Sequence, residues 1–193
     1  MVGMSIIQTP APENVTGLAA QIYADDLNDF GYVPEHTRVM AVNPEAYVAW
    51  EALIGSIAKP LGVRRYELVT LAAARGVKSE HCLLAHGNKT LRYIEEEQLT
   101  RIARDFRDAS LTEAEVAMMA FAEKVSTDAS SMTDADSQTL RDAGYSDREI
   151  LDIALAAAAR NYFSRAIQAL SVAVDVPPGL PVGLREALVE GLS

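Results

Sequence analysis

The sequence contains a single cysteine among 193 residues, so it cannot form an intramolecular disulfide. Structural disulfides belong to oxidising compartments, and we therefore expect a reducing, cytoplasmic setting. Basic residues are also scarce, because 17 Lys and Arg face 27 Asp and Glu, which gives a net charge of −10. Phosphate binding needs clustered Lys and Arg, so this balance argues against nucleic acid as the main partner and against anionic membranes.

Long apolar runs are missing as well. No run is long enough to span a bilayer, and residues 1–7 lack the basic segment and apolar stretch of a signal peptide. We find no convincing strand pattern. With 49% hydrophobic and 23% charged residues, the composition is that of an ordinary soluble globular protein. We therefore predict one all-α domain over residues 1–193, in which residues 1–12 form an extended leader.

Apolar residues recur at helical spacing through most of the chain, and two stretches, 68–74 and 150–159, are apolar nearly all round. Such stretches predict central helices that other helices surround. Turns or loops are expected at 59–62 and 126–131. Helices are expected over residues 13–29, 35–42, 44–58, 64–77, 79–95, 97–106, 112–125, 132–143, 147–159 with continuation to 174, and 181–192.

The two apolar stretches also suggest an internal repeat. Each follows a glutamate, and aligning Glu67 with Glu149 places Cys82 opposite Ser164. The same alignment places His86 opposite Gln168, so only the first half would carry reactive side chains. Short helical segments can match by chance. If this match reflects a structural repeat, we predict a pseudo-symmetric bundle.

The stretch from Lys78 to Gly87 carries the residues that can do chemistry. Cys82 and His86 are four positions apart and share one face of a helix. Ser79 is placed to cap the start of that helix, which puts Cys82 in the first turn, where free amide groups and the helix dipole favour negative charge. A free thiol has a pKa of about 8.5, and such surroundings with a histidine nearby lower it by roughly one to several units. The pattern predicts an activated thiol.

Each of these residues also has a structural interpretation. A lone cysteine is usually an inert, buried apolar residue, and His86 can be a core histidine. Glu67 can form a salt bridge with Arg64 or Arg65 at a helix start. His81 points to a different face from Cys82, and the isolated His36 favours a structural role. A closed zinc site needs four ligands, and the sequence clusters too few, so we expect neither metal nor cofactor.

Glu67, Cys82 and His86, with His81 beside the cysteine, form a pattern that resembles the alkylhydroperoxidase-D-like (AhpD-like) family of the carboxymuconolactone decarboxylase superfamily. The resemblance covers most of the chain and includes Asn43-Pro44-Glu45 and the turn Ala143-Gly144-Tyr145-Ser146-Asp147. It implies an all-helical bundle, usually a trimer or hexamer, and thiol-dependent peroxide reduction.

In that family the cysteine matching Cys82 attacks the peroxide, and the residues matching Glu67 and His86, with His81 close by, relay protons. The family's peroxidases have a Cys-x-x-Cys pair, whose first cysteine falls on Ser79 here. The resemblance therefore implies that a sulfenic acid at Cys82 needs an external thiol, a second subunit or a small reductant.

The leading hypothesis is a peroxidase-like antioxidant enzyme that reduces a small-molecule peroxide through Cys82, with an external thiol as its reductant and a homo-oligomeric assembly. A second hypothesis is a cofactor-free lactone decarboxylase or isomerase, in which Glu67 and His86 do acid–base work. A third is a non-catalytic, oligomeric redox-sensing protein with a vestigial site.

Overall fold

A computed structural model describes residues 5–192 of the chain; residues 1–4 of the predicted leader lie outside the described residues. Within 5–192 there are ten α-helices and no strand, which confirms the all-α prediction. The helices are α1 (Gly17–Phe30), α2 (Glu35–Met40), α3 (Pro44–Leu61), α4 (Val63–Gly76), α5 (Glu80–Thr90), α6 (Glu96–Asp105), α7 (Glu113–Asp128), α8 (Asp134–Asp142), α9 (Asp147–Ala169) and α10 (Val182–Val189).

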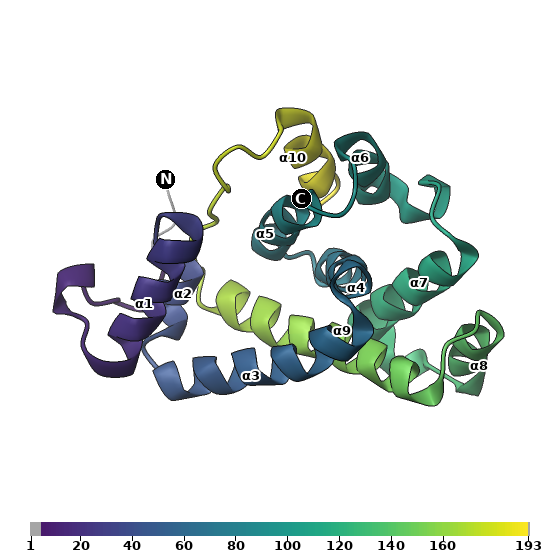
Figure 1. The fold of residues 1–193 in the computed structure, drawn as a ribbon, viewed down its shortest axis with the longest axis horizontal. Coiled ribbons are helices and arrows are strands. Elements are labelled where there is room, and N and C mark those ends of the chain that lie inside the picture. The colour runs from purple at the N-terminus through teal and green to yellow at the C-terminus, as the bar shows by residue number, and fades with distance from the viewer. Residues whose placement is uncertain (1–4, 193) are drawn as a thin grey trace.

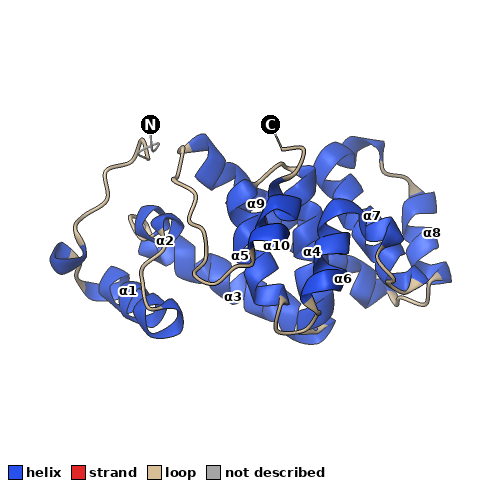
Figure 2. Ribbon diagram, turned by 90° about the horizontal axis from the view of Figure 1, so that it is seen from above, coloured by secondary structure: helices blue, strands red, loops and turns tan. Residues whose placement is uncertain are grey.

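Helix α4 lies at the centre of the bundle and packs against α3, α5, α7 and α9 (Figure 1). Helices α1 and α2 form one end of the molecule and α8 the other, and loops link the helices throughout (Figure 2). Helix α10 returns to pack on α5 and α6. The helix that carries Cys82 is thereby enclosed by segments from both halves of the chain.

The central position of α4 follows from its sequence. Every residue from Tyr66 to Ala74 is buried, so no face of this helix is left for solvent. Leu68 and Val69 are fully buried, and burial of each such side chain stabilises the fold by about 1.5–3 kcal/mol. Replacing Leu68 by alanine would cost about 2–5 kcal/mol because it also leaves a cavity.

Glycines allow two close approaches between helices, one of α4 to α7 and one of α5 to α10. A Cβ on Gly76, at the end of α4, would lie 2.7 Å from Cβ of Ser126 in α7, so the end of α4 is tightly packed. A Cβ on Gly87 would overlap the side chain of Leu188, so this glycine lets α10 pack directly on α5. Larger residues at either position would push these helices apart.

Two predicted loops are wrong, because both segments are helical. Helix α3 continues through Pro60 to Leu61, which is buried. Pro60 has no N–H for the carbonyl of Ser56, but Ser56 is exposed, and Gly62 N donates to Ala58 O at 3.0 Å. Helix α7 continues to Asp128 and is followed by a 3₁₀ turn. There Ser126 is buried against Gly76 of α4, and this packing keeps the segment helical while its Oγ donates to the carbonyl of Ala122 at 2.9 Å.

Two predicted helix ends are too late. Helix α5 stops at Thr90, whose Oγ1 donates to the carbonyl of His86, and does not reach Glu95. Helix α9 stops at Ala169, because Ser171 takes a positive φ of 49° that ends the helical run, and does not reach Val174. The early end of α9 frees the loop from 170 to 181, which returns over α5.

The predicted internal repeat stays a prediction. Helices α4 and α9 are both apolar and pack on each other. The chain breaks between α4 and α5, whereas α9 is continuous over the corresponding stretch.

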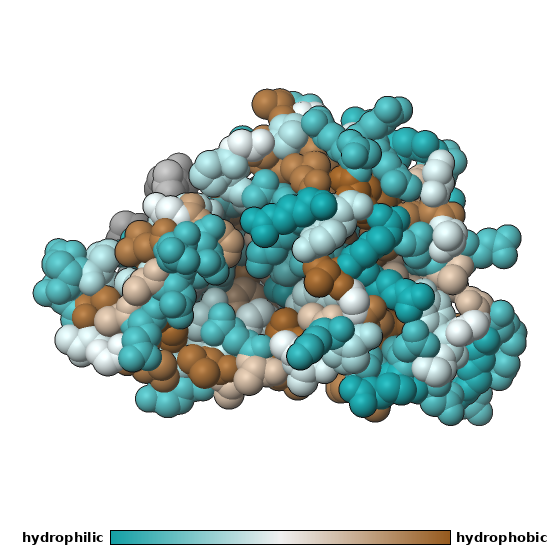
Figure 3. Space-filling view, viewed as in Figure 1, coloured by the Kyte–Doolittle hydropathy of each residue, from teal (hydrophilic) through white to brown (hydrophobic). Residues whose placement is uncertain are grey.

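None of the helices in residues 5–192 is long and apolar enough to cross a membrane. The face seen in Figure 3 is mostly hydrophilic with scattered hydrophobic areas, as the excess of acidic residues leads one to expect.

Candidate active site

A cavity of about 570 Å³ lies beside α5 and brings together four of the five residues singled out from the sequence. Cys82, His86, Glu67 and His81 all line it. They are joined there by residues of α2, α3 and α9 and of the loop that follows α9. Ser79 does not line the cavity; its Oγ accepts the N–H of Cys82 at 3.5 Å and caps the start of α5.

The sulfur of Cys82 is surrounded by hydrogen-bond donors. Cys82 is the third residue of α5 and only 1% exposed. Ser164 Oγ donates to Sγ at 3.2 Å, and Arg160 Nη1 donates to Sγ at 3.5 Å. A guanidinium charge, a hydroxyl donor and a helix start are all groups that can stabilise negative charge developing on the sulfur.

Arg160 is a residue of this cavity that sequence reasoning missed. It is 2% exposed, and its Nη2 donates to Tyr66 Oη at 3.4 Å. Burial alone would lower the pKa of Arg160, but its interactions with Cys82 and Tyr66 outweigh burial and raise it, so the guanidinium stays charged. A signal was present, because Arg160 directly follows the apolar stretch 150–159. A charge that continues a buried helix face needs a buried partner.

Glu67 and His86 form a hydrogen-bonded pair on the other side of the cavity. Glu67 Oε2 lies 2.6 Å from His86 Nδ1, and both side chains are buried. Burial lowers the pKa of His86 to about 4, assisted by the charge of Arg160. Burial pushes the pKa of Glu67 upward, but His86, Lys89 and Arg160 outweigh it, and the pKa is lowered.

At neutral pH the pair therefore consists of a carboxylate and a neutral imidazole. Nδ1 of His86 carries the proton that it donates to Glu67, and Nε2 is left with a free lone pair. Such an imidazole is a general base oriented by a carboxylate. Arg64 and Arg65 pair with Glu115 and Glu149, so the alternative interpretation of Glu67, a salt bridge with either arginine, is not the arrangement in the structure.

His81 faces away from this pair and meets His36. Nε2 of His81 lies 2.7 Å from Nδ1 of His36, so His36 is not the isolated residue that its sequence position indicates. Burial lowers the pKa of His81 to about 4 and that of His36 well below its usual value, so both rings are neutral at pH 7. A carboxylate oxygen of Asp175 completes a group of three ligand atoms that lie within 4.8 Å of one another.

Aromatic rings form a further wall of the cavity. Trp50 and Phe163 stack with their ring centroids 4.5 Å apart, and Tyr47 stacks on Trp50 at 6.1 Å. The guanidinium of Arg160 lies 5.6 Å from the ring centroids of both Trp50 and Phe163. The space next to Cys82 therefore suits a small molecule with an apolar or aromatic body and a polar reacting group.

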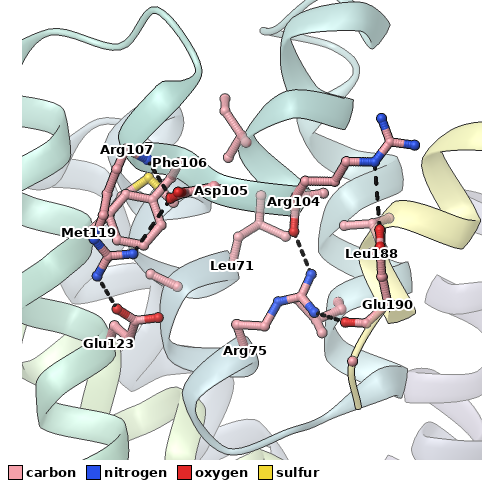
Figure 4. Close-up of a pocket in the computed structure, with 15 residues that line it drawn as sticks. Leu71, Arg75, Arg104, Asp105, Phe106, Arg107, Met119, Glu123, Leu188 and Glu190 are labelled. Carbon is pink, nitrogen blue, oxygen red and sulfur yellow. Dashed lines mark hydrogen bonds and ion pairs between the residues drawn. The ribbon is translucent and has the colours of Figure 1, made fainter. Parts of the chain in front are cut away.

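A second cavity, of about 350 Å³, lies between α4, α6 and α10 (Figure 4). Its charged side chains bond to one another or to the main chain. Arg107 pairs with Glu123 at 2.6 Å, and Arg75 donates to the carbonyls of Ala103, Ala187 and Glu190. It contains no cysteine or histidine, so the chemistry of the described chain gathers in the cavity at Cys82.

Comparison with known proteins gave matches among solved structures alone. No family model matches the sequence, and no curated protein matches it. The AhpD core protein of Ralstonia eutropha JMP134, described as an uncharacterized peroxidase-related protein, superposes with a TM-score of 0.79 at 22% identity over 90% of this chain and 93% of that chain. The chain has the AhpD fold. This confirms, for the architecture, the resemblance drawn from Glu67, Cys82 and His86.

Other structures share the AhpD fold with this chain. A peroxidase-related protein of Silicibacter sp. TM1040 gives a TM-score of 0.73 at 21% identity, over 89% of this chain and 92% of that chain. The debrominase Bmp8, as a cysteine-to-alanine variant in complex with 2,3,4-tribromopyrrole, gives 0.75 at 18% identity over 96% of this chain and 98% of that chain. The AhpD fold thus carries more than one named activity.

Proposed function

We propose that this protein is a thiol-dependent, peroxidase-like enzyme that reduces a small-molecule peroxide through Cys82. One observation carries the proposal: Sγ of Cys82 accepts hydrogen bonds from Arg160 and Ser164 at the edge of a cavity that is large enough for a small substrate. An inert buried cysteine needs neither a buried cation nor a hydroxyl donor. Both groups stabilise the negative charge of a nucleophilic thiolate.

The reaction balances with the groups in this cavity. Nε2 of His86 accepts the thiol proton, directly or through water, while Glu67 holds the imidazole in the required tautomer. The thiolate of Cys82 attacks the terminal oxygen of ROOH, which carries the hydrogen, the O–O bond breaks, and the departing RO⁻ takes a proton from His86. Cys82 becomes a sulfenic acid and the peroxide ROOH becomes the alcohol ROH.

Return to the thiol requires a reductant from outside the chain, because the sequence has no second cysteine. One external thiol condenses with the sulfenic acid to give a mixed disulfide and water, and a second releases Cys82 as the external disulfide forms. Cys82 is 1% exposed and reached through the cavity, which favours a low-molecular-weight thiol over a protein dithiol.

The test is peroxide consumption in the presence of a small thiol, with hydrogen peroxide and an aromatic hydroperoxide as substrates. Wild-type protein should consume peroxide faster than the thiol alone, and Cys82→Ser should fall to that background. Arg165→Met, which changes an exposed arginine of the same helix as Arg160, is the matched control and should keep wild-type activity. Equal consumption by wild type and Cys82→Ser would contradict the proposal.

A halogenated aromatic is the second candidate substrate, favoured by the ring stack of Trp50 and Phe163 beside Cys82 and by the tribromopyrrole named for Bmp8. The same thiolate would take the halogen from the ring, and the ring carbon would keep the bond electrons and gain a proton. One external thiol would then displace halide from the sulfur to give a mixed disulfide, and a second would release Cys82 as the external disulfide forms. Halide release from a bromopyrrole with no peroxide consumption would favour this candidate over the first.

An acid–base reaction without sulfur chemistry, such as lactone decarboxylation or isomerisation, would rest on the Glu67–His86 pair alone. Activity that survives Cys82→Ser and is lost in His86→Ala would identify it. Reversible oxidation of Cys82 without turnover would instead identify a redox-sensing protein.

The predicted homo-oligomer, a trimer or hexamer, stays part of the proposal. Exposed apolar residues on neighbouring helices support it, because contiguous exposed apolar surface often marks an interface between chains. They are Val48 and Leu53 on α3 and Leu151, Leu155 and Tyr162 on α9. Sedimentation of the purified protein tests the assembly independently of its activity.

A further inference from the structure

The ring nitrogens of His36 and His81 meet an acidic side chain at one corner of the cavity. Nδ1 of His36 and Nε2 of His81 are 2.7 Å apart, and a carboxylate oxygen of Asp175 lies within 4.8 Å of both. The three residues come from α2, α5 and the loop that follows α9, so residues far apart in the sequence converge here.

The surroundings of these residues are those of ligands. Imidazole nitrogens are the commonest protein ligands of transition metals, and both rings lie within the protein, with His81 buried and His36 half-buried. The carboxylate of Asp175 is oriented by a hydrogen bond from Glu35 N to Oδ2 at 2.8 Å. Second contacts of this kind orient metal-ligating carboxylates in general.

The spacing requires only a small adjustment. Zinc bonds of about 2.0–2.1 Å hold two tetrahedrally arranged nitrogens about 3.3 Å apart, so the two rings separate by about 0.6 Å as their mutual hydrogen bond is replaced. The proton shared by the rings moves to an outer nitrogen. The outer nitrogens are Nε2 of His36 and Nδ1 of His81, and Nδ1 of His81 lies near the Ala173 backbone, which can accept a hydrogen bond from it.

We propose that His36, His81 and Asp175 form a three-ligand binding site for a divalent transition metal ion such as Zn²⁺. Two imidazoles and one carboxylate form a ligand set that binds transition metals better than Mg²⁺ or Ca²⁺. Three protein ligands leave coordination positions for water or an exogenous ligand. All three residues line the cavity that contains Cys82, so such an ion borders the same space. The inference does not depend on peroxidase activity.

Isothermal titration of metal-free protein with Zn²⁺ tests the site. Wild type should bind one equivalent. His36→Asn and Asp175→Asn should each weaken binding by about 100-fold or more, because loss of even an outer partner of a ligand costs about 10- to 100-fold. Asp26→Asn is the matched control: Asp26 lines the same cavity but lies outside the group of three, and its variant should bind as wild type does.

Cys82→Ser separates this site from one built on sulfur. It should keep full zinc affinity, and Co²⁺-loaded wild type should lack a sulfur-to-cobalt charge-transfer band. Circular dichroism of each variant confirms that the helices are retained. No binding by wild type, equal binding by His36→Asn and wild type, or loss of binding in Cys82→Ser would each overturn the assignment, whatever the outcome of the peroxide assay.

Discussion

Ser164 Oγ of α9 donates a hydrogen bond to Sγ of Cys82 in α5 across 3.2 Å. The same two residues are matched in the alignment of the two apolar stretches that pairs Glu67 with Glu149. The serine and the cysteine therefore share one site, and the hydroxyl stabilises negative charge on the sulfur.

Ser164→Ala removes this donor and leaves the backbone unchanged. Hydrogen bonds to charged groups contribute about 1.5–3 kcal/mol, so we expect alkylation of Cys82 by iodoacetamide at pH 7 to slow by about tenfold. Rates from mass spectrometry of the alkylated peptide measure it. Ser56→Ala on the exposed side of α3 should leave the rate unchanged, and an equal rate in Ser164→Ala would show that the hydroxyl has no part in the reactivity.

Arg160→Met keeps the length of the side chain and removes its charge. The thiolate of Cys82 then loses its nearest cation, and we expect the alkylation rate at pH 7 to fall by at least about tenfold, which corresponds to about 1.4 kcal/mol. The deficit should narrow as the pH is raised, because hydroxide then ionises the thiol. A uniform deficit at every pH would point to lost access and not to lost charge.

Glu67→Gln tests the orientation of His86. An amide in place of the carboxylate can donate to Nδ1, which moves the ring proton to Nε2 and removes the base. General bases contribute about 10²- to 10⁴-fold, and we expect peroxide consumption to drop within that range. Glu51→Gln, at another acid that lines the cavity, is the control, and a similar loss in both variants would indicate a general charge effect instead.

The buried histidines make stability depend on pH. His81 and His86 have pKa values of about 4 in the folded chain and about 6.5 when unfolded, so between these limits the unfolded chain binds more protons. Stability is therefore fully present above pH 6.5 and falls as the pH drops toward 4, by about 2 kcal/mol per histidine between pH 7 and 5. Urea unfolding at both pH values measures the change, and His81→Gln should show a smaller loss than wild type.

Ser79→Cys would place a second thiol three residues before Cys82. Because Ser79 Oγ already contacts the Cys82 backbone, we expect the two sulfurs to form a disulfide after peroxide treatment, seen as loss of two hydrogens in the intact mass. Ser56→Cys, on the exposed side of α3, should give no internal disulfide. Persistence of a sulfenic acid at Cys82 in Ser79→Cys would show that the site geometry excludes a local resolving thiol.

The sequence was sufficient for the helices and for one side of the cavity. Helical periodicity identified the two central helices, and the spacing of Cys82 and His86 placed both on one face of α5. The sequence analysis did not identify Arg160, His36 and Asp175 as residues of the site. Their positions depend on contacts between distant segments, which no local pattern contains. The loops predicted at Pro60 and Ser126 were wrong because tertiary packing keeps both segments helical against their local preference.

Intact-protein mass spectrometry after one equivalent of peroxide tests the central claim most directly. The account predicts that wild type gains one oxygen atom at Cys82, that a small thiol removes it, and that Arg160→Met gains it at least about tenfold more slowly than Arg165→Met. An unmodified Cys82 in folded wild-type protein, or oxidation at equal rates in the two arginine variants, would contradict it.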